Sequence, residues 1–103
     1  MEIASSQRDG VVIVTVTGDV DLLSREELGR GLTDAVTEAR RGVEVDLSGV
    51  DFLDSSGMSA LLSGRRTAED AGLSFRVVAA GDLVRRVMVL TGVWPLLTGQ
   101  GNE

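Results

Sequence analysis

The sequence predicts an α/β domain with a mixed sheet of four or five strands and three or four helices, in the order β-β-α-β-α-β-α. Runs rich in valine, isoleucine and threonine alternate with segments whose apolar residues recur at helical spacing, and this alternation predicts mostly parallel strands. The first two strand-like runs are separated by the turn dipeptide Asp9-Gly10, which predicts an antiparallel hairpin at the N-terminal edge. The length of 103 residues fits one domain.

The first elements are two strands and a helix. Residues 10–21 are mostly Val, Ile and Thr with apolar side chains on both faces, which predicts an inner strand covered on two sides. Residues 2–5 are expected to pair with it as an edge strand. A helix is expected after Ser24, because Ser24 and Glu27 have the spacing of a capping box. Cations and a glycine at 40–42 end that helix.

The remaining elements continue the alternation. They are a core strand at 43–48, a turn at 48–51, a helix opening at 54–58 and ending near Asp70, a core strand at 74–79 and a last helix that begins at Gly81-Asp82. Residues 93–97 are expected to be extended, because Trp94 precedes a proline. The domain is therefore expected to cover residues 1–98, with 99–103 as a short flexible tail.

The composition excludes several classes of function. The formal net charge of -6 argues against affinity for nucleic acid or anionic lipid, and no apolar run is long enough to span a membrane. All ten basic residues are arginines, and the chain has no lysine, histidine or cysteine. Thiol, imidazole and Schiff-base chemistry are thereby removed. We expect a protein that is not an enzyme, has no cofactor or metal, and is cytoplasmic, since the N-terminus lacks a signal sequence.

Residues 52–58 are the most informative segment. Asp54, Ser55, Ser56 and Gly57 follow one another where a strand is expected to pass into a helix. The first backbone N–H groups of a helix lack partners and attract oxygen atoms, so a seryl phosphate there is expected to find donors. Gly57 leaves room for another backbone to approach. The same residues also suit an ordinary helix N-terminus, and chemistry alone leaves both interpretations open.

The helix that follows carries two kinds of apolar residue. One stripe, with small residues that allow close packing on the sheet, consists of Gly57, Leu61, Gly64, Ala68 and Ala71. Met58 and Leu62 lie to its side. If they are uncovered, they form a docking surface beside the serines. If the last helix covers them, they belong to the core.

These segments resemble the STAS-domain anti-sigma factor antagonists, small bacterial proteins of partner-switching systems that regulate transcription. The resemblance covers nearly the whole chain. It is carried by residues 17–21 (Thr-Gly-Asp-Val-Asp), by the run from Val45 to Met58 with its Asp-Ser-Ser-Gly motif, and by residues 83–97 with Thr-Gly-Val. Asp19 stands where the family more often has Glu, and Met58-Ser59 where Leu-Gly is usual.

The resemblance implies a phosphoprotein of the STAS fold. Ser55 matches the serine that accepts phosphate from a partner that is both a serine kinase and an anti-sigma factor, and Ser56 is the second candidate. The unmodified form is expected to bind that partner and release the sigma factor, and phosphorylation to switch binding off. The residues implied in partner binding are Gly18, Asp19, Asp21, Asp54, Ser56, Gly57, Met58 and Leu62. In the free state we expect a monomer.

Four other interpretations of these residues arise from the sequence. One is a STAS module that binds or scaffolds a signalling or transport complex without being phosphorylated. Another is a Mg²⁺ site of the receiver type formed by Asp19, Asp21 and Asp54, although the lysine used by receivers is missing. Asp19 and Asp21 could instead simply end a strand near a helix start. A hydrolase with Ser55 as nucleophile lacks a visible base.

Overall fold

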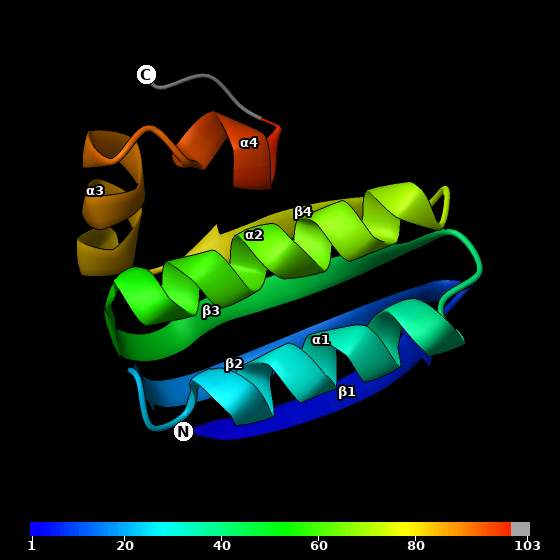
Figure 1. The fold of residues 1–103 in the computed structure, drawn as a ribbon, viewed down its shortest axis with the longest axis horizontal. Helices are drawn as coiled ribbons and strands as arrows, with labels where there is room; N and C mark the ends of the chain where they lie inside the picture. Colours follow the sequence, from blue (N-terminus) through cyan, green and yellow to red (C-terminus); the bar gives the residue numbers. More distant parts are fainter. Residues whose placement is uncertain (100–103) are drawn as a thin grey trace.

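The computed structural model describes residues 1–99 and forms two layers, a sheet and a pair of helices (Figure 1). The strands are β1 (Glu2–Arg8), β2 (Val11–Val20), β3 (Gly42–Leu53) and β4 (Ser74–Ala80), and the helices are α1 (Arg25–Glu38), α2 (Ser55–Asp70), α3 (Asp82–Leu90) and α4 (Trp94–Thr98). The sheet order is β1-β2-β3-β4, with β1 antiparallel to β2 and the other pairs parallel. The predicted mixed sheet and element order are confirmed, with one further helix. Of the predicted tail, residues 100–103 lie outside the described part.

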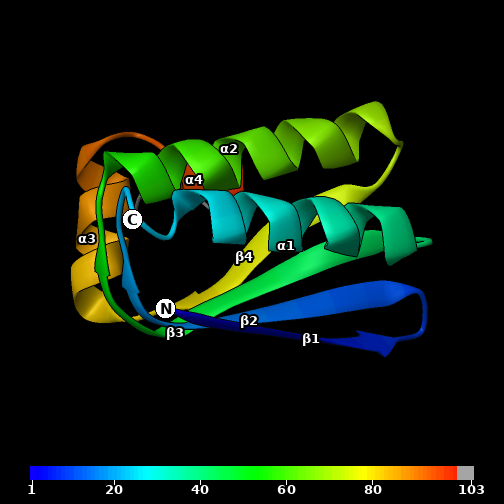
Figure 2. The same cartoon turned by 60° about the horizontal axis from the view of Figure 1, so that its bottom comes forward.

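The core lies between the sheet and helices α1 and α2, which run along the same face (Figure 2). Val12 and Val14 of β2 pair with Val43 and Val45 of β3, and all four are buried. Alternate residues of each strand therefore face the helices. Each fully buried valine or leucine stabilises the fold by about 1.5–3 kcal/mol relative to exposure.

The prediction that β2 is covered on two sides is wrong. Val11 and Ile13, on its other face, are only half-buried, and Thr15 is exposed. No helix lies over that face of β2 in Figure 2. Val11 and Ile13 instead line a hollow on that face together with Arg8 and Arg41.

Three predicted boundaries differ from the structure. Residues 48–51, expected as a turn, belong to β3, which runs on to Leu53 with shifted register against β2. The edge strand extends to Arg8. Residues 93–97 are not extended but form α4, where Pro95 lies in the first turn and needs no N–H donor. Gly99 ends α4 with a left-handed φ of 72°.

No helix within residues 1–99 is both long enough and apolar enough to cross a membrane.

Helices α3 and α4 close one end and one edge of the sheet. Val84 and Met88 of α3 are buried, α4 packs against β4, and the Arg85 guanidinium lies 5.4 Å from the Trp94 ring centre. This arrangement places the end of α3 beside the start of α2.

Candidate functional site

Asp54 fixes the start of α2. It is the N-cap residue, in extended conformation, and its carboxylate oxygen Oδ1 accepts hydrogen bonds from the N–H groups of Ser56 (2.9 Å) and Gly57 (3.2 Å). Its own N–H donates to the carbonyl of Val20 at 3.2 Å, which connects the cap to the end of β2. An aspartate in this position stabilises a helix by about 1 kcal/mol. The cap is therefore Asp54, and not Ser56.

Ser55 is the first residue of α2 and is exposed. Its hydroxyl makes no hydrogen bond with any of residues 1–99. Ser56, the second candidate, is half-buried. The positive end of the helix dipole lies directly below Ser55, so negative charge on this side chain is compatible with the fold.

The helix offers fewer free donors to a phosphate than its sequence predicts. Three of the four N–H groups from Asp54 to Gly57 already have acceptors. The N–H groups of Ser56 and Gly57 both donate to Oδ1 of Asp54, and the N–H of Asp54 donates to the carbonyl of Val20. Only the N–H of Ser55 has no acceptor within the part of the chain that the structure describes. The expected cradle of donors is occupied by Asp54, and a phosphate on Ser55 would face solvent next to a carboxylate.

The segment from Gly18 to Asp21, which is the end of β2 and the residue after it, lies beside this helix start. Val20 pairs with Leu53, and Asp19 pairs with Phe52, at the carboxyl ends of the adjacent strands β2 and β3. Gly18 has φ of 88°, a conformation that favours glycine, at a register shift in β2. The two motifs, which are more than thirty residues apart in the chain, therefore form one surface.

Asp21 and Ser24 hold the turn that leads into α1. The Asp21 carboxylate accepts from the N–H groups of Leu23 (3.0 Å) and Ser24 (3.2 Å), and Ser24 Oγ accepts from the N–H of Asp21 (2.9 Å). The predicted capping box is wrong, because Ser24 bonds back to Asp21 and makes no cap bond to α1. Asp21 has the structural role that the sequence left open. Asp19 is exposed, and its carboxylate makes no hydrogen bond or ion pair within residues 1–99.

Gly57 serves packing and does not leave space for a partner. It is buried, and a Cβ added there would overlap Leu53 Cδ1 and lie 2.8 Å from Val20 Cγ1. Both side chains are themselves buried, so they have little room to yield. The ends of β2 and β3 therefore fill the space beside Gly57, and the missing side chain allows α2 to lie close to the sheet.

Met58 and Leu62 are not an open docking surface. Met58 is 9% exposed, and the hydroxyl of Thr91, at the end of α3, lies 3.5 Å from its sulfur. Leu62 is half-buried against the core. Met58 is therefore covered by the end of α3, which is the alternative in which it belongs to the core. Its contact with a partner would require α3 to shift.

Other apolar side chains are exposed around the start of α2, and the sequence analysis missed them. We call them the apolar rim: Leu22 (67% exposed), Leu23 (93%), Phe52 (49%) and Leu90 (78%). Leu22 and Leu23 belong to the turn held by Asp21, Phe52 precedes Asp54 by two residues, and Leu90 precedes Thr91. Two adjacent leucines between a strand end and a helix start were a readable signal, because no strand or helix period accounts for them.

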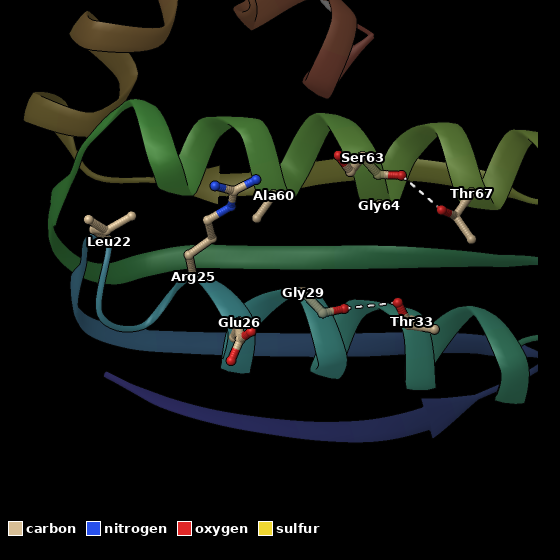
Figure 3. A pocket seen from close by; sticks show the side chains of 9 residues that line it. All are labelled: Leu22, Arg25, Glu26, Gly29, Thr33, Ala60, Ser63, Gly64 and Thr67. Atoms are coloured by element: carbon tan, nitrogen blue, oxygen red, sulfur yellow. Dashed lines mark hydrogen bonds between the residues drawn. The ribbon is translucent and has the colours of Figure 1, made fainter.

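A groove of about 590 Å³ continues from the rim between α1 and α2 (Figure 3). Its floor is formed by small residues such as Gly29, Ala60 and Gly64. The side chain of Arg25 extends from α1 across the groove toward Ala60 (Figure 3). The hydroxyls of Thr33 and Thr67 donate to backbone carbonyls of their own helices, at 3.0 Å each, so toward a ligand they could act only as acceptors.

The carboxylates do not form a metal centre. Within residues 1–99, no three acidic side chains come together in a way that could hold a metal ion, and this includes Asp19, Asp21 and Asp54. Asp21 and Asp54 each use a carboxylate oxygen to bind backbone N–H groups. The receiver-type interpretation therefore lacks its ligand set.

The family model described as "Mlab, STAS domain" matches residues 3–98. The anti-sigma-F factor antagonist RsfB of Mycobacterium tuberculosis is 32% identical over 90 residues, which are 85% of this chain and 71% of RsfB.

Three solved structures have the same fold and are informative here. An anti-sigma factor antagonist from Mycobacterium paratuberculosis is 30% identical with a TM-score of 0.76, covering 89% of this chain and 78% of that one. The anti-sigma factor antagonist SpoIIAA in its unphosphorylated form is 20% identical with a TM-score of 0.78, covering 91% and 84%. Its phosphorylated form, from Bacillus, is 19% identical with a TM-score of 0.71, covering 91% and 86%. The SpoIIAA comparisons show likeness of fold.

Proposed function

Because the chain belongs to the STAS-domain family of anti-sigma factor antagonists, we propose that it binds an anti-sigma factor and releases a sigma factor until Ser55 is phosphorylated. The observation that carries this proposal is the exposed Ser55 hydroxyl at the start of α2, beside the segment from Gly18 to Asp21 at the end of β2. The M. tuberculosis relative is named an antagonist of anti-sigma-F. SpoIIAA, of the same fold, is known in a phosphorylated form.

The partner is proposed to be a serine kinase as well as an anti-sigma factor. It would transfer the γ-phosphoryl group of ATP to Oγ of Ser55: the new bond joins Oγ to phosphorus, and the bond from phosphorus to the β,γ-bridging oxygen breaks. The hydroxyl proton passes to a base of the kinase. The present chain supplies the acceptor and no catalytic group. We place this exchange in the cytoplasm, where bacterial transcription occurs, with one domain (residues 1–98) making the contact.

The switch would act through charge at the centre of the contact. A phosphoserine adds about -1.5 to -2 charge at neutral pH. With the helix donors occupied by Asp54, little in the chain itself would neutralise that charge. Burying it against the partner without a matching cation costs several kcal/mol.

Phosphoryl transfer tests the proposal directly. Incubation with ATP and the chain's anti-sigma kinase is expected to add one phosphate, located at Ser55 by mass spectrometry of peptides, and none to Ser55→Ala. Phosphate found on Ser56 of the wild type would contradict the proposal that Ser55 is the acceptor. Stable binding without any phosphorylation would favour the scaffold alternative.

The apolar rim is proposed to supply much of the contact area. Leu23→Ala is expected to weaken binding to the anti-sigma factor roughly tenfold, because a side chain that is 93% exposed in the free chain becomes buried in the complex. The free energy of unfolding should stay within about 0.5 kcal/mol of wild type. Titration calorimetry and thermal unfolding measure the two effects. Leu96→Ala, at an exposed leucine of α4, is the control, and equal loss of affinity in both variants would argue against the rim.

A further inference from the structure

The two edges of the sheet are protected very differently. At β4, helix α4 packs against the strand and buries Trp94 and Leu97. At the other edge, β1 has β2 as its only neighbour, so one side of its backbone has no strand to pair with within residues 1–99 (Figure 2). An open edge of this kind is a template for pairing with another strand.

Strand β1 lacks the devices that normally prevent such pairing. It has seven residues, no proline, and an uninterrupted register with β2 from Glu2 opposite Thr17 to Arg8 opposite Val11. Its only charges are Glu2 and Arg8, at its two ends. The five residues between them are uncharged, so nothing repels an incoming strand along the middle of the edge.

The two terminal charges lie on the same face of the sheet. Ile3 lies against Gly31 of α1, and Gln7 donates a hydrogen bond of 3.1 Å to Glu38 of α1, so odd-numbered residues of β1 face the helices. Side chains alternate along a strand, so Glu2 and Arg8 project from the opposite, uncovered face. Both are exposed, and neither forms an ion pair within the described chain.

We propose that this edge binds a second copy of the same chain, with the two β1 strands antiparallel about a two-fold axis at Ser5. In that register Ser5 faces Ser5, and Glu2 of each copy faces Arg8 of the other. The strand is thus complementary to itself in charge, and symmetry supplies the ion pair twice. The result is a continuous eight-stranded sheet. The strands reverse direction across the axis, so the two Ser55 sites lie at opposite ends and both stay accessible.

This inference revises the monomer expected from the sequence, and it does not depend on the proposed function of Ser55. Sedimentation equilibrium of the full chain from micromolar to millimolar concentration is expected to show a monomer–dimer equilibrium. Arg8→Glu, which turns both ion pairs into repulsions, should raise the dimer dissociation constant roughly tenfold. Adding Glu2→Arg to it should restore wild-type dimerisation within roughly twofold. Arg66→Glu, an equal charge change on the exposed side of α2, should have no effect.

A cross-linking experiment fixes the register, since the chain has no cysteine of its own. With diamide accepting the two hydrogen atoms, Ser5→Cys should form an intermolecular disulfide faster than Ser6→Cys, whose residue faces Ala4 of the other copy. A wild type that stays monomeric at all concentrations, a dimer that ignores Arg8→Glu, or faster cross-linking of Ser6→Cys would each overturn the proposal.

Discussion

Ser55→Asp is expected to lower the affinity for the anti-sigma factor roughly a hundredfold or more, while Ser55→Ala stays within roughly threefold of wild type. The carboxylate adds negative charge at an exposed position beside Asp54, where the helix donors that could have neutralised it are occupied. An uncompensated charge in an interface costs about 3 kcal/mol, which corresponds to roughly a hundredfold in the dissociation constant. Surface plasmon resonance with the purified partner measures both variants.

Two controls separate this effect from trivial causes. Ser55→Asp should be at least as stable as wild type in thermal unfolding, because an acid in the first turn of a helix is favourable by about 0.3–1 kcal/mol. Ser63→Asp adds the same charge two turns further along α2, also at an exposed residue, and should bind nearly normally. Tight binding by Ser55→Asp would refute the proposed switch. An equal loss of affinity in Ser63→Asp would show that added negative charge weakens binding wherever it lies on α2.

Gly57→Ala is expected to destabilise the fold by about 1–3 kcal/mol, although alanine is the better helix former. The new methyl group would overlap the buried Leu53 side chain and crowd Val20, so α2 must move away from the ends of β2 and β3. For a chain of this length each kcal/mol lowers the midpoint of thermal unfolding by about 4–8 °C. Urea unfolding and calorimetry measure the loss. Affinity for the partner should fall as well, because Ser55 moves relative to the segment from Gly18 to Asp21.

Gly29→Ala is the matched control for that substitution. No atom lies within 4 Å of a Cβ placed at Gly29, which is inside α1. The same change there should therefore stabilise the protein by about 0.5–1 kcal/mol, through reduced freedom of the unfolded chain. If Gly57→Ala stabilised the protein as well, Leu53 and Val20 would leave room for a methyl group at Gly57, which would contradict the close packing described here.

The sequence predicted the strand-to-helix junction at Ser55 well, because the signals there are local. The change of apolar period from two to about 3.6 and the Asp-Ser-Ser-Gly run both indicate a helix start within a few residues. Pro95 was also informative, but it led to the prediction that residues 93–97 are extended. A proline that lies in a first turn, with Gly99 four residues later, is equally typical of a short helix.

What the sequence could not predict depends on competition between groups and on distant packing. Ser24 has the spacing for a capping box, yet Asp21, three residues before it, takes its hydrogen bonds in place of Glu27, three residues after it. Met58 would be exposed on an isolated helix, and only the place where α3 ends covers it with Thr91. Gly57 is likewise explained only by Leu53 and Val20, which approach it from two strands. Each of these outcomes depends on where a second strand or helix lies, which the local sequence does not indicate.

The occupied donors of α2 also bear on how long a signal would last. Because Asp54 already satisfies the helix start, a phosphate on Ser55 would gain few bonds from its own chain and would remain as hydrated as a free phosphomonoester. Ser55 is exposed within the described residues, so the proposed ester would be accessible to a phosphatase. The lifetime of the inactive form would then be set by the balance of the two opposing enzymes, which allows the output to follow a changing stimulus in both directions.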